Sequence, residues 1–179
     1  GAALDSDGQP QASWIDPLPA FANQATVAHV HAAPDPDGDV RSVLLTKEGA
    51  NTRRWALGLE AARFFLGAGR PLEQPDSVTL GSIRLPASLA DNRLLFINYA
   101  GPEGTFQRVS FADLIERRAE PASFQNKLVI LGVTAQGGGD RIFTPVSSGI
   151  GMSGIEIHAN VIRTILDKAF LMPVGPVAE

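Results

Sequence analysis

The chain has 179 residues, of which 44% are hydrophobic and 19% are charged, a balance typical of folded globular domains and too apolar for an intrinsically disordered chain. Its formal net charge of −4 argues against the basic surface that nucleic-acid binding requires. The absence of cysteine excludes disulfides, thiolate metal sites and cysteine nucleophiles.

The first third of the chain predicts a hairpin and a helix. Asp37 and Gly38 form a strong tight-turn signal between two runs of strand formers, so residues 25–46 are predicted to form a hairpin. Apolar residues at helical spacing then predict a helix within residues 53–71, with Thr52 as its N-cap and Gly67, Gly69 and Pro71 ending it.

Two patterns in this region resemble metal sites. Asp35, Asp37 and Asp39 alternate as in a calcium loop, but the glycine and glutamate that such a loop needs further on are missing, so a plain turn is favoured. His29 and His31 would face the same side of a strand, but no third ligand with comparable spacing accompanies them. We therefore expect surface histidines, no metal and no cofactor.

The middle of the chain predicts strands and one short helix. Residues 77–86 contain two short strands that meet at a glycine, and residues 93–101 supply a third, which together predict a meander. Ser110 caps a brief helix over residues 111–118. Residues 127–133 form a nearly unbroken apolar run, which predicts a strand covered on both faces in the middle of a sheet. The predicted fold class is therefore α/β, with a mixed sheet and flanking helices in a single domain.

The last helix is predicted over residues 154–170, after a long glycine-rich loop. Ser153 and Glu156 have the spacing of a capping box, in which serine caps the helix and glutamate reaches back to it. His158 lies beside the apolar stripe of this helix, so a hydrogen-bonded, half-buried histidine is favoured over a general base.

The loop before this helix lacks the motifs of two kinds of enzyme. Glycines occupy the positions where a P-loop needs lysine and a hydroxyl residue, and no Gly-x-Ser-x-Gly elbow surrounds any of its serines. A triad is unsupported, and we expect no catalytic residue.

A ligand site is nevertheless expected in this loop, because it follows a predicted sheet strand, and open α/β sheets bind ligands beyond the carboxyl ends of their strands. Its predicted polar contacts are Asp140 and Thr144, with Arg141 able to meet an anion. The alternative is structural: Asp140 holds the loop by accepting backbone N–H bonds, and Thr144 with Pro145 fixes its exit.

Five segments, in this order, resemble the extracytoplasmic sensor domain called CHASE, type two. They are residues 34–43, 80–86, 93–115, 126–145 and 151–166. The most specific block consists of the apolar run ending at Gly132, then Asp140, Thr144 with Pro145, and the helix start from Gly154 to Asn160.

The resemblance implies a non-catalytic domain that receives a signal, from a small molecule or a protein, outside the cytoplasmic membrane. Transmembrane segments outside this sequence would anchor it, and cytoplasmic cyclases, diguanylate cyclases or kinases would form its output. A homodimer is left open. In this interpretation residues 1–16 are a flexible lead-in, 17–173 the sensor domain and 174–179 a tail toward the membrane, and Ser153, Glu156, His158 and Asn160 are structural. A hydrolase-type α/β enzyme and a soluble periplasmic binding protein are the alternatives.

Overall fold

The computed structural model describes residues 14–49, 52–134 and 141–173 of the chain. Helices and strands are interspersed along the sequence in a single domain, which confirms the predicted α/β class. In chain order the elements are α1 (Pro19–Ala22), β1 (Ser42–Leu44), β2 (Thr46–Glu48), β3 (Arg53–Trp55), α2 (Leu57–Phe65), β4 (Leu72–Gln74), β5 (Ser77–Leu80), β6 (Ile83–Leu85), β7 (Leu94–Phe96), α3 (Phe111–Ile115), the 3-10 helix η1 (Pro121–Phe124), β8 (Arg141–Ile142), β9 (Met152–Ser153) and α4 (Gly154–Leu166).

The strands of the described part pair in four small antiparallel sheets. β1 pairs with β7, β2 with β3, and β8 with β9, while β4, β5 and β6 form a three-stranded sheet. Parallel pairing among the described residues is limited to the isolated bridges His29–Ala56 and Asp39–Phe143. The predicted meander is confirmed for β5 and β6 only, because β7 pairs with β1 instead of β6.

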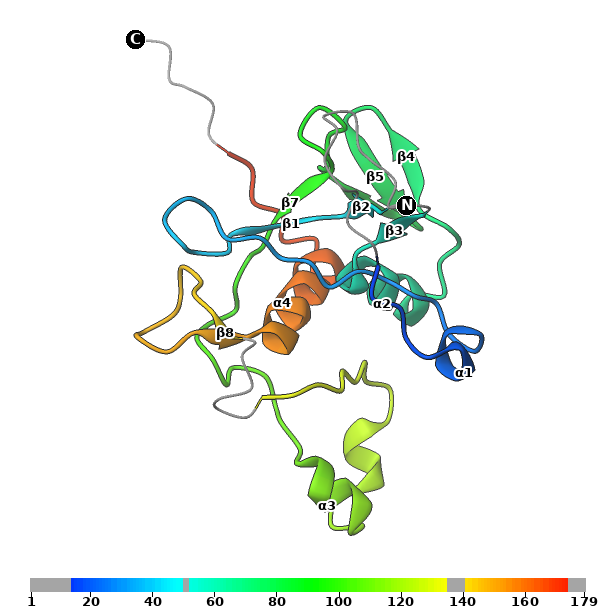
Figure 1. Cartoon of the computed structure of the whole chain (residues 1–179), viewed down its shortest axis with the longest axis vertical. Coiled ribbons are helices and arrows are strands. Elements are labelled where there is room, and N and C mark those ends of the chain that lie inside the picture. Colours follow the sequence, from blue (N-terminus) through cyan, green and yellow to red (C-terminus); the bar gives the residue numbers. More distant parts are fainter. Residues whose placement is uncertain (1–13, 50–51, 135–140, 174–179) are drawn as a thin grey trace, which may run out of the picture.

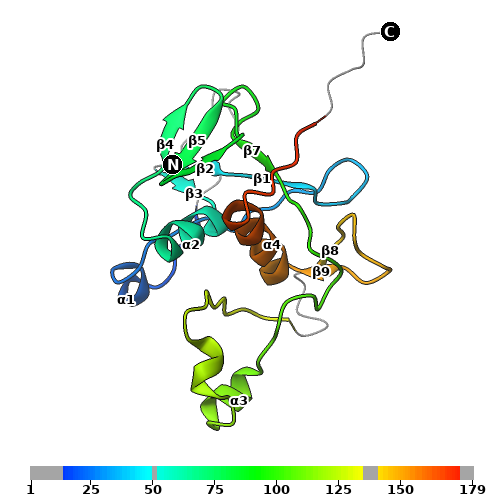
Figure 2. The ribbon, with the colours of Figure 1, turned by 180° about the vertical axis from the view of Figure 1, so that it is seen from behind.

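The core lies between these small sheets and the helix pair α2 and α4, which lie side by side in both views (Figures 1 and 2). α2 presents Leu59 and Ala62 to the core, and α4 presents Ile157, Val161 and Ile165 at helical spacing. The absence of a side chain at one position of α2 lets the two helices approach closely: a Cβ added at Gly58 would lie 2.5 Å from the Val161 Cγ1 atom.

The predicted turn at Asp37 and Gly38 is present, with Gly38 at a φ of 94°. The hairpin around it is wrong, because β1 pairs with β7 across the sequence and not with the residues before the turn. A guanidinium occupies the place where a calcium ion would have been held: Arg41 forms ion pairs of 3.0, 2.7 and 3.3 Å with Asp35, Asp37 and Asp39.

Two further predictions near the N-terminus are corrected. The helix predicted from Thr52 begins only at Leu57, because residues 53–55 pair with β2 as a strand. His29 is buried, with 2% of its surface exposed, and its ring stacks on the Trp14 ring at a centroid distance of 6.3 Å. The small residues that alternate with His29 do not indicate this burial, because the tryptophan that covers the His29 ring lies 15 positions earlier in the chain.

Residues 109–133, which we call the arm, project away from the rest of the domain in both views, and return to it at Gly132, which packs against Ile155 of α4 (Figures 1 and 2). The arm contains α3 and η1, none of its residues is buried, and it supplies nothing to the core. α3 begins as predicted, because the Ser110 hydroxyl accepts a hydrogen bond of 3.2 Å from the Ala112 N–H.

The prediction of a buried central strand at residues 127–133 is wrong, since this run belongs to no sheet of the described part and exposes large apolar side chains. Just beyond β7, side chains of α4 bind backbone N–H groups that a neighbouring strand could otherwise use: Thr164 Oγ1 accepts a 3.0 Å bond from the Asn98 N–H, and Asn160 Oδ1 accepts a 2.8 Å bond from the Ala100 N–H.

Candidate functional site

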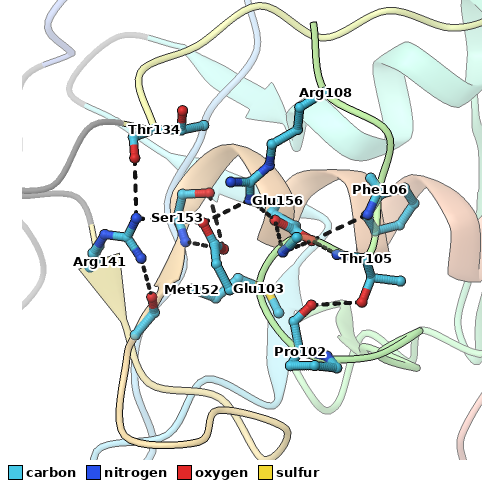
Figure 3. A network of polar contacts seen from close by, with 12 residues as sticks. Pro102, Glu103, Thr105, Phe106, Arg108, Thr134, Arg141, Met152, Ser153 and Glu156 are labelled. Atoms are coloured by element: carbon cyan, nitrogen blue, oxygen red, sulfur yellow. Dashed lines mark hydrogen bonds and ion pairs between the residues drawn. The ribbon is translucent and has the colours of Figure 1, made fainter.

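A cluster of charged side chains surrounds the start of α4 (Figure 3). We call it the polar junction and define it by Glu103, Arg108, Arg141, Ser153 and Glu156. Three separate stretches of chain meet in it: the segment after β7, the strand β8, and the turn from β9 into α4.

Glu156 is the buried acid of the junction, with 3% of its surface exposed. Its carboxylate accepts hydrogen bonds of 2.9 Å from both the Gly104 and Thr105 N–H groups and a longer one from the Phe106 N–H, and it pairs with the Arg108 guanidinium. These donors replace the water that burial removes from the carboxylate, so the buried charge is compensated.

The predicted capping box is therefore wrong in its contacts, although Ser153 is the N-cap as expected. Ser153 makes no side-chain cap bond, and its N–H and hydroxyl instead donate to Glu103 Oε2 at 3.0 and 3.3 Å. Glu156 turns toward residues 104–106 because their backbone N–H groups and Arg108 provide more donors than one N-cap N–H could offer.

Glu103 joins the two arginines of the junction. Its carboxylate lies 2.7 Å from the Arg108 guanidinium and 3.6 Å from that of Arg141. Burial raises the pKa of Glu103, but the Ser153 N–H and Arg108 outweigh it, so the pKa remains below its usual value. The hydrogen bond to Glu103 in turn raises the pKa of Arg108, so both groups stay charged at neutral pH.

Arg141, one of the predicted ligand contacts, ties the end of the arm to the junction. Its guanidinium donates to the carbonyl oxygens of Gly151 and Thr134 at 2.8 and 3.1 Å. Its Nε is buried and has no hydrogen-bond partner among the described residues. A buried donor of this kind is costly unless something accepts from it.

The other two predicted ligand contacts have different outcomes. Asp140 lies outside the described residues. Thr144 is buried, with 2% of its surface exposed, and its hydroxyl lies 3.0 Å from the Ser147 hydroxyl in a local turn. That a ligand contacts these two residues stays a prediction.

His158 and Asn160 both lie on the buried side of α4, with 7% and 0% of their surfaces exposed. Asn160 joins the junction to β7, since its side chain accepts from the Ala100 N–H and donates to the Glu156 carbonyl oxygen at 2.9 Å. His158 is more deeply buried than the half-buried position that the sequence predicts, because α2 packs against α4.

An open hollow of about 500 Å³ adjoins the junction at the base of the arm. Its lining includes Arg108, Ser110, Asp113, Arg118 and Ser123. Arg108 thus belongs both to the hollow and to the junction. Among the described residues no group of three or more histidine, aspartate or glutamate side chains could hold a metal ion.

Sequence reasoning missed Glu103 and Arg108, the two junction residues after β7. Glu103 sits in a Gly-Pro-Glu-Gly turn, which reads as an ordinary loop, and its partner Ser153 is 50 positions away. The signal that was available is the charge content of residues 101–108, where one acid and one base accompany an otherwise uncharged segment.

The site does not resemble that of a serine hydrolase. Ser153 is buried, with 1% of its surface exposed, and its hydroxyl donates to a carboxylate. A nucleophile must reach its substrate, and the burial of the Ser153 hydroxyl prevents that in this structure.

No helix in the described part of the chain is both long enough and apolar enough to cross a membrane.

Comparison with protein-family models matches residues 3–178, nearly the whole chain, to the CHASE2 domain. Neither the curated proteins nor the solved structures gave a match.

Proposed function

Because this chain belongs to the CHASE2 family of extracytoplasmic sensor domains, we propose that it receives the signal for a receptor anchored in the cytoplasmic membrane. The output of that receptor would be a cytoplasmic cyclase, diguanylate cyclase or kinase. In this proposal the domain itself binds and transmits and performs no catalysis.

We place signal reception at the hollow beside the polar junction. The observation that carries this proposal is the double role of Arg108, which lines the hollow and also pairs with Glu103 and Glu156. A ligand in the hollow would compete with these two acids for the guanidinium. The loss of the ion pair between Arg108 and Glu156 would then act directly on α4, since Glu156 lies in the first turn of that helix.

The lining is mixed in charge, because Asp113 and Glu120 accompany Arg108 and Arg118, and Arg118 is already paired with Asp113. We therefore propose a small ligand whose carboxylate or phosphate is bound by the Arg108 guanidinium, with hydroxyl groups from Ser110 and Ser123 at the same hollow. Arg141, which the sequence predicts to bind ligand, does not line the hollow and is linked to Arg108 only through Glu103, so it too remains a proposed contact. Asp140 and Thr144 remain proposed contacts on the sequence argument alone.

A thermal-shift screen with small carboxylates and phosphates tests this proposal, because a ligand that binds only the folded state raises the melting temperature. We expect a compound that stabilises the wild-type chain and has lost this effect in Arg108→Gln. The matched control is Arg163→Gln, which removes an exposed arginine paired with Asp167 on the same helix and should keep the ligand effect.

The measured quantity is the shift in melting temperature that the compound causes within each variant. A lower melting temperature of Arg108→Gln without the compound therefore does not affect the comparison. If every stabilising compound acts equally on Arg108→Gln and the wild type, the hollow is not where the signal binds. In the full receptor, Arg108→Gln should change the basal output as well.

A further inference from the structure

The arm carries a row of apolar side chains that nothing in the described structure covers. Val129, Leu131 and Val133 are 60%, 75% and 70% exposed, whereas Leu128 and Ile130 are partly covered and a Cβ at Gly132 would point at Ile155 of α4. Exposure that alternates with a period of two is the pattern of a strand with one covered and one open face. In an ordinary edge strand the open face would be polar.

The backbone of this segment is also unpaired. None of the N–H groups of residues 128–133 donates a hydrogen bond to any group in the part of the chain that the structure describes. A strand edge with free N–H and C=O groups and no charged side chain is a template for pairing with another strand. Residues 128–133 lack the lysine, proline or inward charge that protects natural edges.

The composition of the arm favours a second copy of the same chain as its partner. In a twofold contact a segment meets the same segment of the other copy, so a segment with charges of one sign would repel its partner. Residues 128–133 carry no charge, and the arm as a whole is neutral. Its three basic residues, Arg117, Arg118 and Lys127, balance its three acidic residues, Asp113, Glu116 and Glu120.

We propose that two copies of this domain associate through residues 128–133, which pair as antiparallel strands about a twofold axis at Leu131. Leu131 is the midpoint of the exposed row, so this register places Val129 of each copy opposite Val133 of the other and brings the whole row together. The apolar face of α3, which exposes Phe111 and Ile115, lies on the same arm and would add to the contact.

The first test is the mass of the chain in solution, measured by analytical ultracentrifugation between about 1 and 100 µM. We expect a dimer for the wild type and a monomer for Leu131→Lys, with the dissociation constant raised at least about 100-fold. The control is Leu18→Lys, because Leu18 is similarly exposed, at 69%, but lies far from the arm in the sequence. It should remain dimeric, and Val129→Lys should repeat the effect of Leu131→Lys.

The second test fixes the register. Because the chain has no cysteine, a single introduced thiol can form only an intermolecular disulfide. Leu131→Cys should cross-link readily on oxidation, since directly opposed residues of antiparallel strands lie close enough for a disulfide, and Leu18→Cys should not. A wild type that stays monomeric, or a dimer that survives Leu131→Lys, overturns the proposal. A monomer would mean that another protein or another part of this chain covers the row.

Discussion

Glu156 shows at the scale of one residue how this domain holds a buried charge. Three consecutive backbone N–H groups and one guanidinium donate to the carboxylate, so within the described part of the chain its hydrogen-bond partners are all donors. Such a site is specific for an acceptor, because an amide of the same shape would bring its own N–H donors toward the others.

Replacing Glu156 by Gln should therefore destabilise the domain by about 2 kcal/mol, since the charge of the buried Glu156 that pairs with the half-exposed Arg108 is lost and a donor is left facing donors. Urea denaturation followed by circular dichroism measures this loss. The matched control is Glu48→Gln, because the Glu48 side chain is 75% exposed and its ion pair with Arg53 is a surface pair. An equal effect of both substitutions would contradict the assigned role of Glu156.

The sequence correctly placed Ser153 at the N-cap but could not identify its partners. An N-cap is a local property, governed by a residue and the three that follow it. The acid that meets Ser153 and the donors that meet Glu156 come from residues 103–108, about 50 positions away. No spacing rule relates such positions before the chain is folded.

At the scale of elements, the contact between α2 and α4 depends on one glycine. Gly58→Ala should destabilise the domain by about 1–2 kcal/mol, because the added methyl group would overlap Val161 and its clash outweighs the gain in helix propensity. Thermal melting measures the effect. Gly69→Ala is the control: nothing lies within 4 Å of a Cβ at Gly69, so its melting temperature should be unchanged or slightly higher.

The helices were predicted better than the strands, and the contrast has a physical cause. α4 was found because its apolar spacing, its N-cap position and its length are all local features. The apolar run at residues 127–133 has equally clear local features, but a strand also needs a free neighbouring edge. Just beyond β7, two N–H groups that such a neighbour could use are bonded instead to Asn160 and Thr164 of α4.

At the scale of the whole molecule, acid should weaken the fold in a defined order. Burial, assisted by the charges of His31, Lys47 and His158, lowers the pKa of His29 from 6.5 to about 4. Between these two values the unfolded chain binds a proton that the folded chain does not, so stability falls as the pH falls through this window. Below it, Glu73 and Glu103, whose pKa values are lowered in the folded state, add their own loss as they become protonated.

We expect the free energy of unfolding to drop by about 3 kcal/mol between pH 7 and pH 4 on account of His29 alone. Denaturant titrations at several pH values measure this slope. His29→Asn should flatten it, since asparagine retains an acceptor for the His31 N–H but does not titrate. His31→Asn, at a mostly exposed position, should keep most of the slope, and a wild-type profile without any slope above pH 4 would refute the assignment.

The polar junction also determines how the arm relates to the folding of the rest of the domain. Arg108 before the arm and Thr134 after it are both tied to one cluster, the first through Glu103 and Glu156 and the second through Arg141. The arm is thus a closed loop whose two ends are fixed by contacts that it does not itself make. Closing a loop of about 25 residues, compared with one of about six, costs only about 1 kcal/mol of chain entropy, because this cost grows with the logarithm of length. Apart from Gly132, where a side chain would meet Ile155 of α4, the sequence of the arm is therefore little constrained by folding, and changes within it can alter what the domain binds while the core stays the same.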